Sequence, residues 1–218
     1  MRRSIRVLVA VATLALAIAI MSPIAHADAG LKLRPGSFGP NTEGAWKSKQ
    51  GRPDSRGNAR FALFLQKNTL TAEFVAAYAV VDNIEGTPVS ELTGLSWEHR
   101  TDGHCGAGAP RWNLVVEDPG GISHTVFLGC ATADHLEPTG DPNWMKDAYD
   151  ATAIQAALLA AGVDPGATIT QLYVLFDEGT DTATGGLITA AGFVYLDNIT
   201  VELGGTPKVF SSPGDNGS

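Results

Sequence analysis

The residue types in this sequence that could do chemistry are two cysteines, four tryptophans and a scattered set of carboxylates. Neither a G-x-S-x-G nor an H-E-x-x-H motif occurs, so the sequence lacks common signatures of a serine hydrolase and of a zinc peptidase. We therefore consider these groups first as structural or ligand-binding residues.

Cys105 and Cys130 are the only cysteines, and an even pair in a chain with an export signal (described below) indicates a disulfide. The bond would close a loop of roughly 25 residues and would stabilise the fold by roughly 3 kcal/mol, mainly by restricting the unfolded chain. The alternatives are two buried free thiols, or a zinc site that adds His104 and His135. The adjacency of His104 and Cys105 argues against zinc, because paired ligands of structural zinc are usually about two to four residues apart.

Tryptophans are the candidate sugar-binding residues, because a flat aromatic ring can stack on the apolar face of a pyranose. Trp144 lies in a turn-rich polar segment, Asp141-Pro142-Asn143-Trp144, where its ring could form a ligand platform or pack under the loop. Trp46 is the second candidate. Trp97 and Trp112 instead alternate with leucine and valine, which indicates core positions.

Carboxylates near the end of the chain are candidate calcium ligands. Asp197 and Asp177 are the main candidates, and Glu178 and Asp181 lie beside Asp177. The spacing of Asp177 and Asp181 is looser than in a dedicated calcium loop. The alternative is a solvated acidic turn together with one paired carboxylate.

The first 27 residues match a secretory signal peptide. Three arginines precede an apolar run at 7–21, and Ala25-His26-Ala27 supplies small residues for cleavage after Ala27. The apolar run is shorter than the roughly 20 residues that a membrane span needs. We expect a secreted chain with no membrane anchor after cleavage, consisting of a signal at 1–27, a flexible lead-in at 28–44, a domain at 45–204 and a flexible tail at 205–218.

The net charge excludes one class of partner. Removing the signal leaves 12 basic and 23 acidic residues, which is a net charge of −11. A strongly acidic surface repels nucleic acids and anionic lipids, so we expect neither as a partner. Cations and neutral ligands suit this charge.

Short apolar segments separated by glycine- and proline-containing turns fill the rest of the chain. Residues 111–130 predict a β-hairpin around the turn Asp118-Pro119-Gly120-Gly121. Residues 72–84 are apolar on both faces, which indicates a strand inside a sheet, with a helix as the alternative because the segment is rich in alanine. One short helix is expected to begin at Asp150 and to end at Gly162. Further strands are expected at 60–66, 92–100, 168–176 and 192–203.

These elements predict a mainly all-β fold: an antiparallel β-sandwich, jelly-roll-like, with one short helix. In the last strand, from Phe193 to Leu203, every odd-numbered residue except Asp197 is apolar, so the odd-numbered face is expected to be buried. Asp197 lies on this same face. A buried carboxylate needs a partner. Arg60, Arg111, backbone N–H groups or a cation could each supply it.

The last strand, Val194-Tyr-Leu-Asp-Asn-Ile-Thr-Val201, resembles the terminal strand of jelly-roll carbohydrate-binding modules and related galactose-binding-like domains, and Phe176-Asp-Glu-Gly179 is similar in position. The segment from Cys105 to Asn113 resembles a pattern in uncharacterised secreted actinobacterial proteins. The first resemblance covers about thirty residues; it implies the sandwich fold, a glycan ligand and a structural calcium with Asp197 as a ligand.

Three functions remain open at this stage. The first is a secreted, non-catalytic, carbohydrate-binding β-sandwich. The second is a small secreted hydrolase or lyase that uses a carboxylate pair such as Glu98 with Asp177. The third is a structural or protein-interaction domain. Exposed aromatic rings in an open groove would favour the first, and two converging carboxylates the second.

Overall fold

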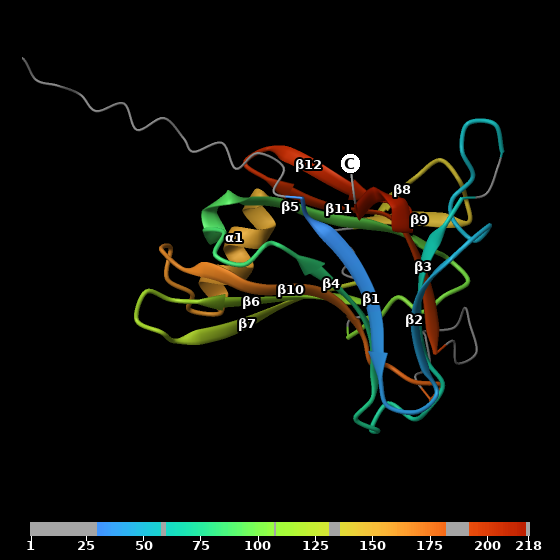
Figure 1. The fold of residues 1–218 in the computed structure, drawn as a ribbon, viewed down its shortest axis with the longest axis horizontal. Coiled ribbons are helices and arrows are strands. Elements are labelled where there is room, and N and C mark those ends of the chain that lie inside the picture. Colours follow the sequence, from blue (N-terminus) through green and yellow to red (C-terminus); the bar gives the residue numbers. More distant parts are fainter. Residues whose placement is uncertain (1–29, 58–59, 107, 131–135, 182–191, 217–218) are drawn as a thin grey trace, which may run out of the picture.

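Strands dominate the computed structural model, which describes residues 30–57, 60–106, 108–130, 136–181 and 192–216. Two antiparallel sheets lie face to face, and the helix closes one end between them (Figure 1). The chain crosses repeatedly from one sheet to the other, and the predicted all-β, jelly-roll-like sandwich with one short helix is confirmed.

The smaller sheet has five strands. Its spatial order is β1 (Lys32–Phe38), β4 (Ala76–Asp82), β10 (Thr168–Phe176), β6 (Arg111–Glu117) and β7 (Ser123–Gly129). As expected, β4 is an interior strand, because it pairs with β1 on one side and with β10 on the other. The predicted hairpin is also confirmed, since β6 and β7 pair from Arg111 opposite Gly129 to Glu117 opposite Ser123.

The larger sheet has seven strands. Its order is β2 (Thr42–Lys47), β3 (Ala62–Lys67), β11 (Phe193–Leu203), β5 (Leu92–Arg100), β9 (Trp144–Asp150) and β8 (Leu136–Pro138), and β12 (Thr206–Phe210) pairs with β11. Two short 3₁₀ helices, η1 (Val89–Glu91) and η2 (Pro213–Asn216), complete the described elements. The sandwich therefore extends beyond the expected range of 45–204, because β1 lies within the expected lead-in and β12 within the expected tail.

The core lies between the inner faces of the sheets, and alternation along each strand determines which side chains enter it. Leu95 and Trp97 of β5 are at most 1% exposed, and so are Trp112 and Leu114 of β6. The rings of Trp97 and Trp112 pack with centroids 5.3 Å apart, which confirms that these two tryptophans are core residues.

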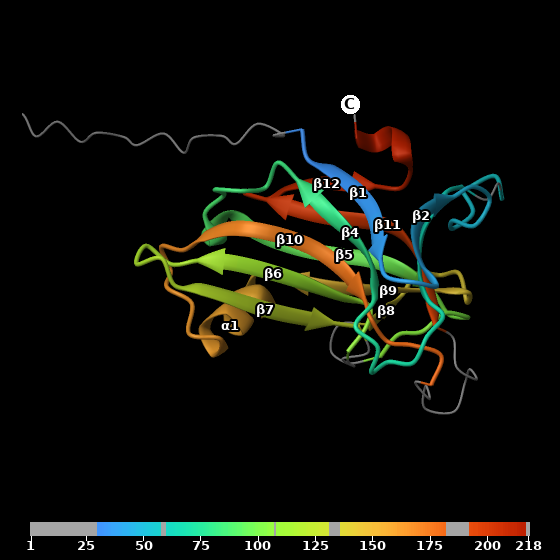
Figure 2. The same cartoon turned by 60° about the horizontal axis from the view of Figure 1, so that its bottom comes forward.

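The helix α1 (Ala151–Ala160) begins where the sequence predicts. Asp150 is its N-cap, and the Asp150 carboxylate accepts a hydrogen bond from the N–H of Ala153 at 2.8 Å. Ile154 and Leu158 form its buried stripe at 0% and 3% exposure. The helix packs beside β5, β7 and β9, where it covers one end of the core (Figure 2).

Cys105 and Cys130 form the expected disulfide. The N–H of Cys130 also donates to the carbonyl of Pro110 at 2.9 Å. The connection from β5 to β6 is therefore held against the end of the hairpin, as the sequence suggests.

A β-bulge in β11 corrects one prediction about the last strand. Against β5, the pairing register shifts between Asp197 and Thr200, and Asn198 has a φ of 47°. Before the bulge the even-numbered Val194 and Leu196 face the core, and after it the odd-numbered Ile199 and Val201 do, all at 0% exposure. The expectation that every odd-numbered residue of this strand faces the core was wrong, because one extra residue reverses the alternation.

The expected signal peptide lies outside the described residues. Among the residues that are described, no helix is both long enough and apolar enough to cross a membrane.

Candidate functional site

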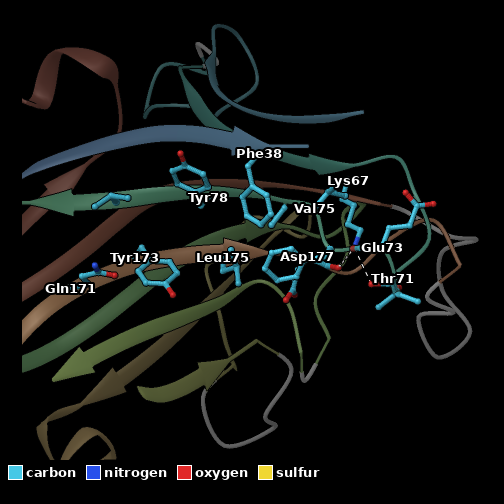
Figure 3. A pocket seen from close by; sticks show the side chains of 14 residues that line it. Phe38, Lys67, Thr71, Glu73, Val75, Tyr78, Gln171, Tyr173, Leu175 and Asp177 are labelled. Atoms are coloured by element: carbon cyan, nitrogen blue, oxygen red, sulfur yellow. Dashed lines mark hydrogen bonds between the residues drawn. The ribbon is translucent and has the colours of Figure 1, made fainter. Parts of the chain in front are cut away.

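A groove of about 560 Å³ lies on the outer face of the five-stranded sheet, over β1, β4 and β10 (Figure 3). The odd-numbered residues of β4 enter the core, so Tyr78 and Val80 face outward. On β10 the even-numbered residues enter the core, and Tyr173 and Leu175 face outward. Because Tyr173 pairs with Val80 and Leu175 with Tyr78, these four side chains form one continuous floor.

Four aromatic side chains line this aromatic groove, which we define by Phe38, Phe74, Tyr78 and Tyr173. Phe38 ends β1 and is 41% exposed, and Phe74 is 92% exposed. The centroids of these two rings are 5.4 Å apart. Phe74 belongs to the 68–75 loop, which connects β3 to β4 and therefore crosses from one sheet to the other.

Gly36 of β1 gives the Tyr78 ring its position. The two residues are cross-strand partners, and a Cβ at Gly36 would lie 2.7 Å from atoms of the Tyr78 ring. Contacts this short do not occur between unbonded carbon atoms. A glycine here therefore lets the tyrosine ring lie across the neighbouring strand.

A polar network supports the groove from β6. Both terminal nitrogens of Arg111 donate to the two carboxylate oxygens of Asp177, each at 2.7 Å, and its Nε donates to Oδ1 of Asn113 at 3.0 Å. Nδ2 of Asn113 in turn donates to the hydroxyl of Tyr173 at 3.1 Å. The network fixes the orientation of the Tyr173 hydroxyl and places hydrogen-bonding groups beside the aromatic rings.

The outer face continues past the groove onto β7. Phe127 is the cross-strand partner of Asn113 and is 60% exposed. Cζ of Arg111 lies 5.4 Å from the centroid of the Phe127 ring. The outer face therefore offers aromatic surface on both sides of the Arg111 network.

The two tryptophans expected to bind ligand lie elsewhere. Trp144, at the start of β9, is 3% exposed, so its ring has no free face in this structure. Trp46 is half-buried on β2 and packs against the core. Neither residue lines the aromatic groove.

Asp197 is 1% exposed, as expected for a buried carboxylate, but it lies on the outer face of the seven-stranded sheet opposite Glu98. The backbone N–H of Arg52 donates to Oδ2 at 2.8 Å, and that of Asn198 donates to Oδ1 at 2.7 Å. The Arg52 side chain pairs with Glu98 at 2.6 Å. Burial raises the pKa of Asp197 to about 6, although the two N–H donors act in the opposite direction. Two backbone N–H groups therefore bind this carboxylate, and the charge of Arg60, one of the expected partners, also acts to lower its pKa.

The surroundings of Asp197 and Asp177 do not fit a calcium ion. Calcium is coordinated by oxygen atoms, whereas both oxygens of Asp197 accept hydrogen bonds from backbone N–H groups and the neighbouring Glu98 is paired with Arg52. Both oxygens of Asp177 are engaged by Arg111. The two carboxylates also belong to different sheets, so the structure does not bring them together.

The residues of the alternative zinc site are otherwise engaged. The disulfide removes both thiolates, His104 pairs with Glu178, and His135 lies outside the described residues. Another histidine, His99, lies beside the disulfide, with Nδ1 3.8 Å from Sγ of Cys130. Burial lowers the pKa of His99 to about 4, so the imidazole is neutral at pH 7.

The sequence contained part of the signal for this groove. Alternation places Phe74, Ala76, Tyr78 and Val80 on one face of their segment. Because the other face is apolar too, the sequence does not show which of the two faces is outward. Tyr173 was expected only as a strand residue. Its position beside Tyr78 depends on the pairing of β4 with β10, which are far apart in the sequence.

Comparisons with protein-family models and with curated proteins find no match to this chain. Solved structures with a similar arrangement include a family 11 carbohydrate-binding module of a cellulosomal cellulase from Clostridium thermocellum. It is 10% identical in sequence, with a TM-score of 0.43 over 79% of this chain and 88% of that one.

Two family 22 modules are also similar. The C-terminal module of a Clostridium thermocellum enzyme, Xyn10B, is 13% identical, with a TM-score of 0.33 over 84% of this chain and 91% of that one. A xylan-binding domain of the same family is 14% identical, with a TM-score of 0.33 over 84% and 92%. Each of these three TM-scores is below 0.5, so the likeness is distant.

Proposed function

We propose that this chain is a carbohydrate-binding β-sandwich and that its ligand lies in the aromatic groove. One observation carries the proposal. Exposed rings from β1 and the 68–75 loop and half-buried rings from β4 and β10 meet in one groove, beside the hydrogen-bonding network of Arg111, Asn113 and Asp177. Binding sites for small molecules commonly combine apolar lining with a few fixed polar groups.

The chemistry of the groove matches a sugar ring. A pyranose has an apolar C–H face, which an aromatic ring can cover, and a rim of hydroxyls that donate and accept hydrogen bonds. Tyrosine supplies both properties in one side chain, and the exposed Gln171 adds an amide beside Tyr173. A neutral polysaccharide also suits the acidic chain.

The dimensions of the face favour a chain of several sugars. Four steps of about 4.8 Å between neighbouring strands separate β1 from β7, so the face is about 19 Å wide. Aromatic residues lie near both sides of it, with Phe38 on β1 and Phe127 on β7. An oligosaccharide lying across the strands could contact both.

Export is part of the same proposal. The signal sequence and the disulfide both support an oxidising location outside the cytoplasm. The intact mass of the purified chain, measured without reductant, should match a protein that starts at Asp28 and has lost two hydrogens. A full-length mass or a free thiol would contradict this expectation.

The test of binding is affinity electrophoresis of the mature chain in gels that contain soluble xylan, hydroxyethyl cellulose or galactomannan, followed by a glycan array. We expect retardation by at least one polysaccharide. Phe74→Ala should weaken it, because the ring is 92% exposed and its loss removes contact surface without opening the core.

Phe61→Ala is the matched control, since Phe61 is also exposed, at 36%, but precedes β3 of the other sheet. No retardation in any gel and no array signal would overturn the proposal, and so would equal binding by Phe74→Ala and the wild type.

The hydrolase or lyase alternative has less support. Glu98 lies on the outer face of the seven-stranded sheet beneath Arg52, whereas Asp177 lines the groove of the other sheet. The suggested pair therefore does not face one ligand. Release of new chain ends from a retained polysaccharide would nevertheless favour this alternative.

A further inference from the structure

The most exposed aromatic side chain of the groove lies on a segment without regular secondary structure. Phe74 belongs to the 68–75 loop, and its ring extends into solvent. A ligand that had to order a mobile loop would lose affinity to the entropy of ordering it. What holds this loop therefore bears directly on binding.

The buried side chain of Lys67 binds the backbone of this loop. This lysine ends β3 with the same parity as Leu63 and Leu65, so its side chain points inward, and it is 0% exposed. Its ammonium group donates to the carbonyls of Thr71, Glu73 and Asp177 at 3.0, 2.6 and 2.8 Å (Figure 3). An ammonium group has three N–H donors, and each of them has a backbone acceptor here.

These three acceptors belong to two different segments. Thr71 and Glu73 are in the 68–75 loop, whereas Asp177 directly follows β10. The lysine therefore ties the loop that carries Phe74 to the strand that carries Tyr173. A buried charge is stable only when it is fully hydrogen-bonded, so the geometry of the three carbonyls is strongly constrained.

A second contact joins the same two segments from outside. Both the N–H and the hydroxyl of Thr71 donate to Oδ1 of Asp181 at 2.7 Å, and the hydroxyl accepts from the N–H of Gly179 at 3.0 Å. A Cβ at Gly179 would lie 1.9 Å from the carbonyl oxygen of Thr69. A glycine at this position thus permits the close approach of the two segments.

We propose that Lys67 is a positioning residue that holds the 68–75 loop in its binding geometry before ligand arrives, and so determines the affinity of the groove. This inference rests on the proposed function for its effect on binding. Lys67 does not need to touch the sugar. Substitution of Lys67 keeps all the aromatic residues of the groove, but it raises the entropic cost of bringing Phe74 to the ligand.

The test uses Lys67→Met, which keeps an unbranched side chain and removes the three hydrogen bonds. Lys146→Met is the matched control, because Lys146 is a partly exposed lysine of β9 that pairs only with Glu137 among the described residues. Affinity for soluble xylan and hydroxyethyl cellulose is measured well below the melting temperature, together with hydrogen exchange of residues 68–76. We expect a loss of roughly tenfold in affinity and faster exchange in this peptide for Lys67→Met only.

The exchange measurement separates positioning from a general loss of stability. A merely structural role would lower the melting temperature without selectively freeing residues 68–76 in the native state. Titration calorimetry should place the affinity loss in the entropy of binding. Unchanged exchange of this peptide would overturn the inference, and so would unchanged affinity in a variant whose loop exchanges faster.

Asp181→Ala keeps the inference testable if Lys67→Met does not fold. This substitution removes the hydrogen bond from the Thr71 N–H to Asp181 on the solvent side of the loop. We expect roughly threefold weaker binding with faster exchange at residue 71. Unchanged exchange and affinity in Asp181→Ala would then count against it. If the wild type binds no polysaccharide in the gels and no glycan on the array, the proposed function fails, whereas exchange in the two variants still decides whether the loop is anchored as described.

Discussion

The two outer faces of the sandwich both carry aromatic side chains, and they differ in what lies over them. On the seven-stranded sheet, Phe64, Phe193 and Tyr195 form a covered aromatic cluster whose ring centroids are 4.7–6.1 Å apart. Lys47 lies 5.4 Å from the Phe64 centroid, and Cζ of Arg100 lies 3.8 Å from that of Tyr195.

In the aromatic groove of the five-stranded sheet, Phe38 and Phe74 remain 41% and 92% exposed. In the covered aromatic cluster the rings pack against one another and against cations, which stabilises the fold. The groove leaves much of the Phe38 and Phe74 rings to solvent, where a ligand could cover them. Stability and binding should therefore respond to substitutions on opposite faces.

The largest expected effect is on stability, at the covered cluster. Phe64 is 8% exposed, and Phe64→Ala should lower the free energy of unfolding by about 3–5 kcal/mol, because it leaves a cavity among packed rings. Affinity for polysaccharide should not change in the fraction that remains folded. Urea denaturation and affinity gels measure the two quantities, and an altered affinity would break the comparison.

A buried acid of the same sheet should give a smaller effect that depends on pH. Asp147 is 1% exposed, and neither carboxylate oxygen has a hydrogen-bond partner among the described residues. Burial raises its pKa from 3.8 to about 7. The folded chain thus holds this proton more tightly than the unfolded chain, and stability is lost as pH rises from about 4 to 7.

At roughly 1.4 kcal/mol per pKa unit, the loss from Asp147 approaches about 4 kcal/mol, and compaction of the unfolded chain reduces it. Asp147→Asn should therefore gain about 2–3 kcal/mol over the wild type at pH 8, and little at pH 4. The lowered pKa of His99 makes the folded chain lose stability as pH falls below 6.5, which is the opposite direction. Because His99 is present in both proteins, this effect cancels in their difference. A difference between the two proteins that does not vary with pH would refute the assignment.

Binding should be lost mainly through the floor of the groove. The double substitution Tyr78→Ala, Tyr173→Ala should weaken polysaccharide binding about 100-fold, equivalent to about 2.7 kcal/mol, because both stacking surfaces are removed. Its melting temperature should fall less than that of Phe64→Ala, since both tyrosines are only half-buried. A double variant that binds as the wild type does would place the ligand elsewhere.

The smallest expected effect comes from uncovering a ring. Arg100→Met removes the cation above Tyr195 and should lower stability by about 1 kcal/mol. It should not create binding, because Tyr195 still packs against Phe64. If the variant is retarded in a polysaccharide gel more than the wild type, an exposed aromatic ring alone would be enough for binding. The arrangement of rings in the groove would then not be required.

Local patterns in the sequence predicted much of the fold. Alternating residues identified the hairpin at 111–130, and Asp150 marked the start of the helix, because both signals act over a few neighbouring residues. The reversal in β11 was missed, since a bulge depends on the register with β5 and leaves only Asn198 as a local sign.

The residues of the proposed binding groove were harder to predict for a related reason. Tryptophans were expected as ligand platforms because they are the largest rings, yet their size also makes them the most rewarding residues to bury. Trp97, Trp112 and Trp144 are all at most 3% exposed. The groove instead uses phenylalanine and tyrosine from segments that only long-range strand pairing brings together.

The bulge at Asn198 also has a meaning for how this sequence can change over time. It is one inserted residue that both halves of β11 now depend on, because each half faces the core with a different parity. Deleting a single codon there would turn one half of the strand inside out, a change that no nearby substitution repairs. Variation in length among descendants of this chain should therefore collect in exposed stretches such as 53–57, while β11 accepts substitutions and keeps its residue count.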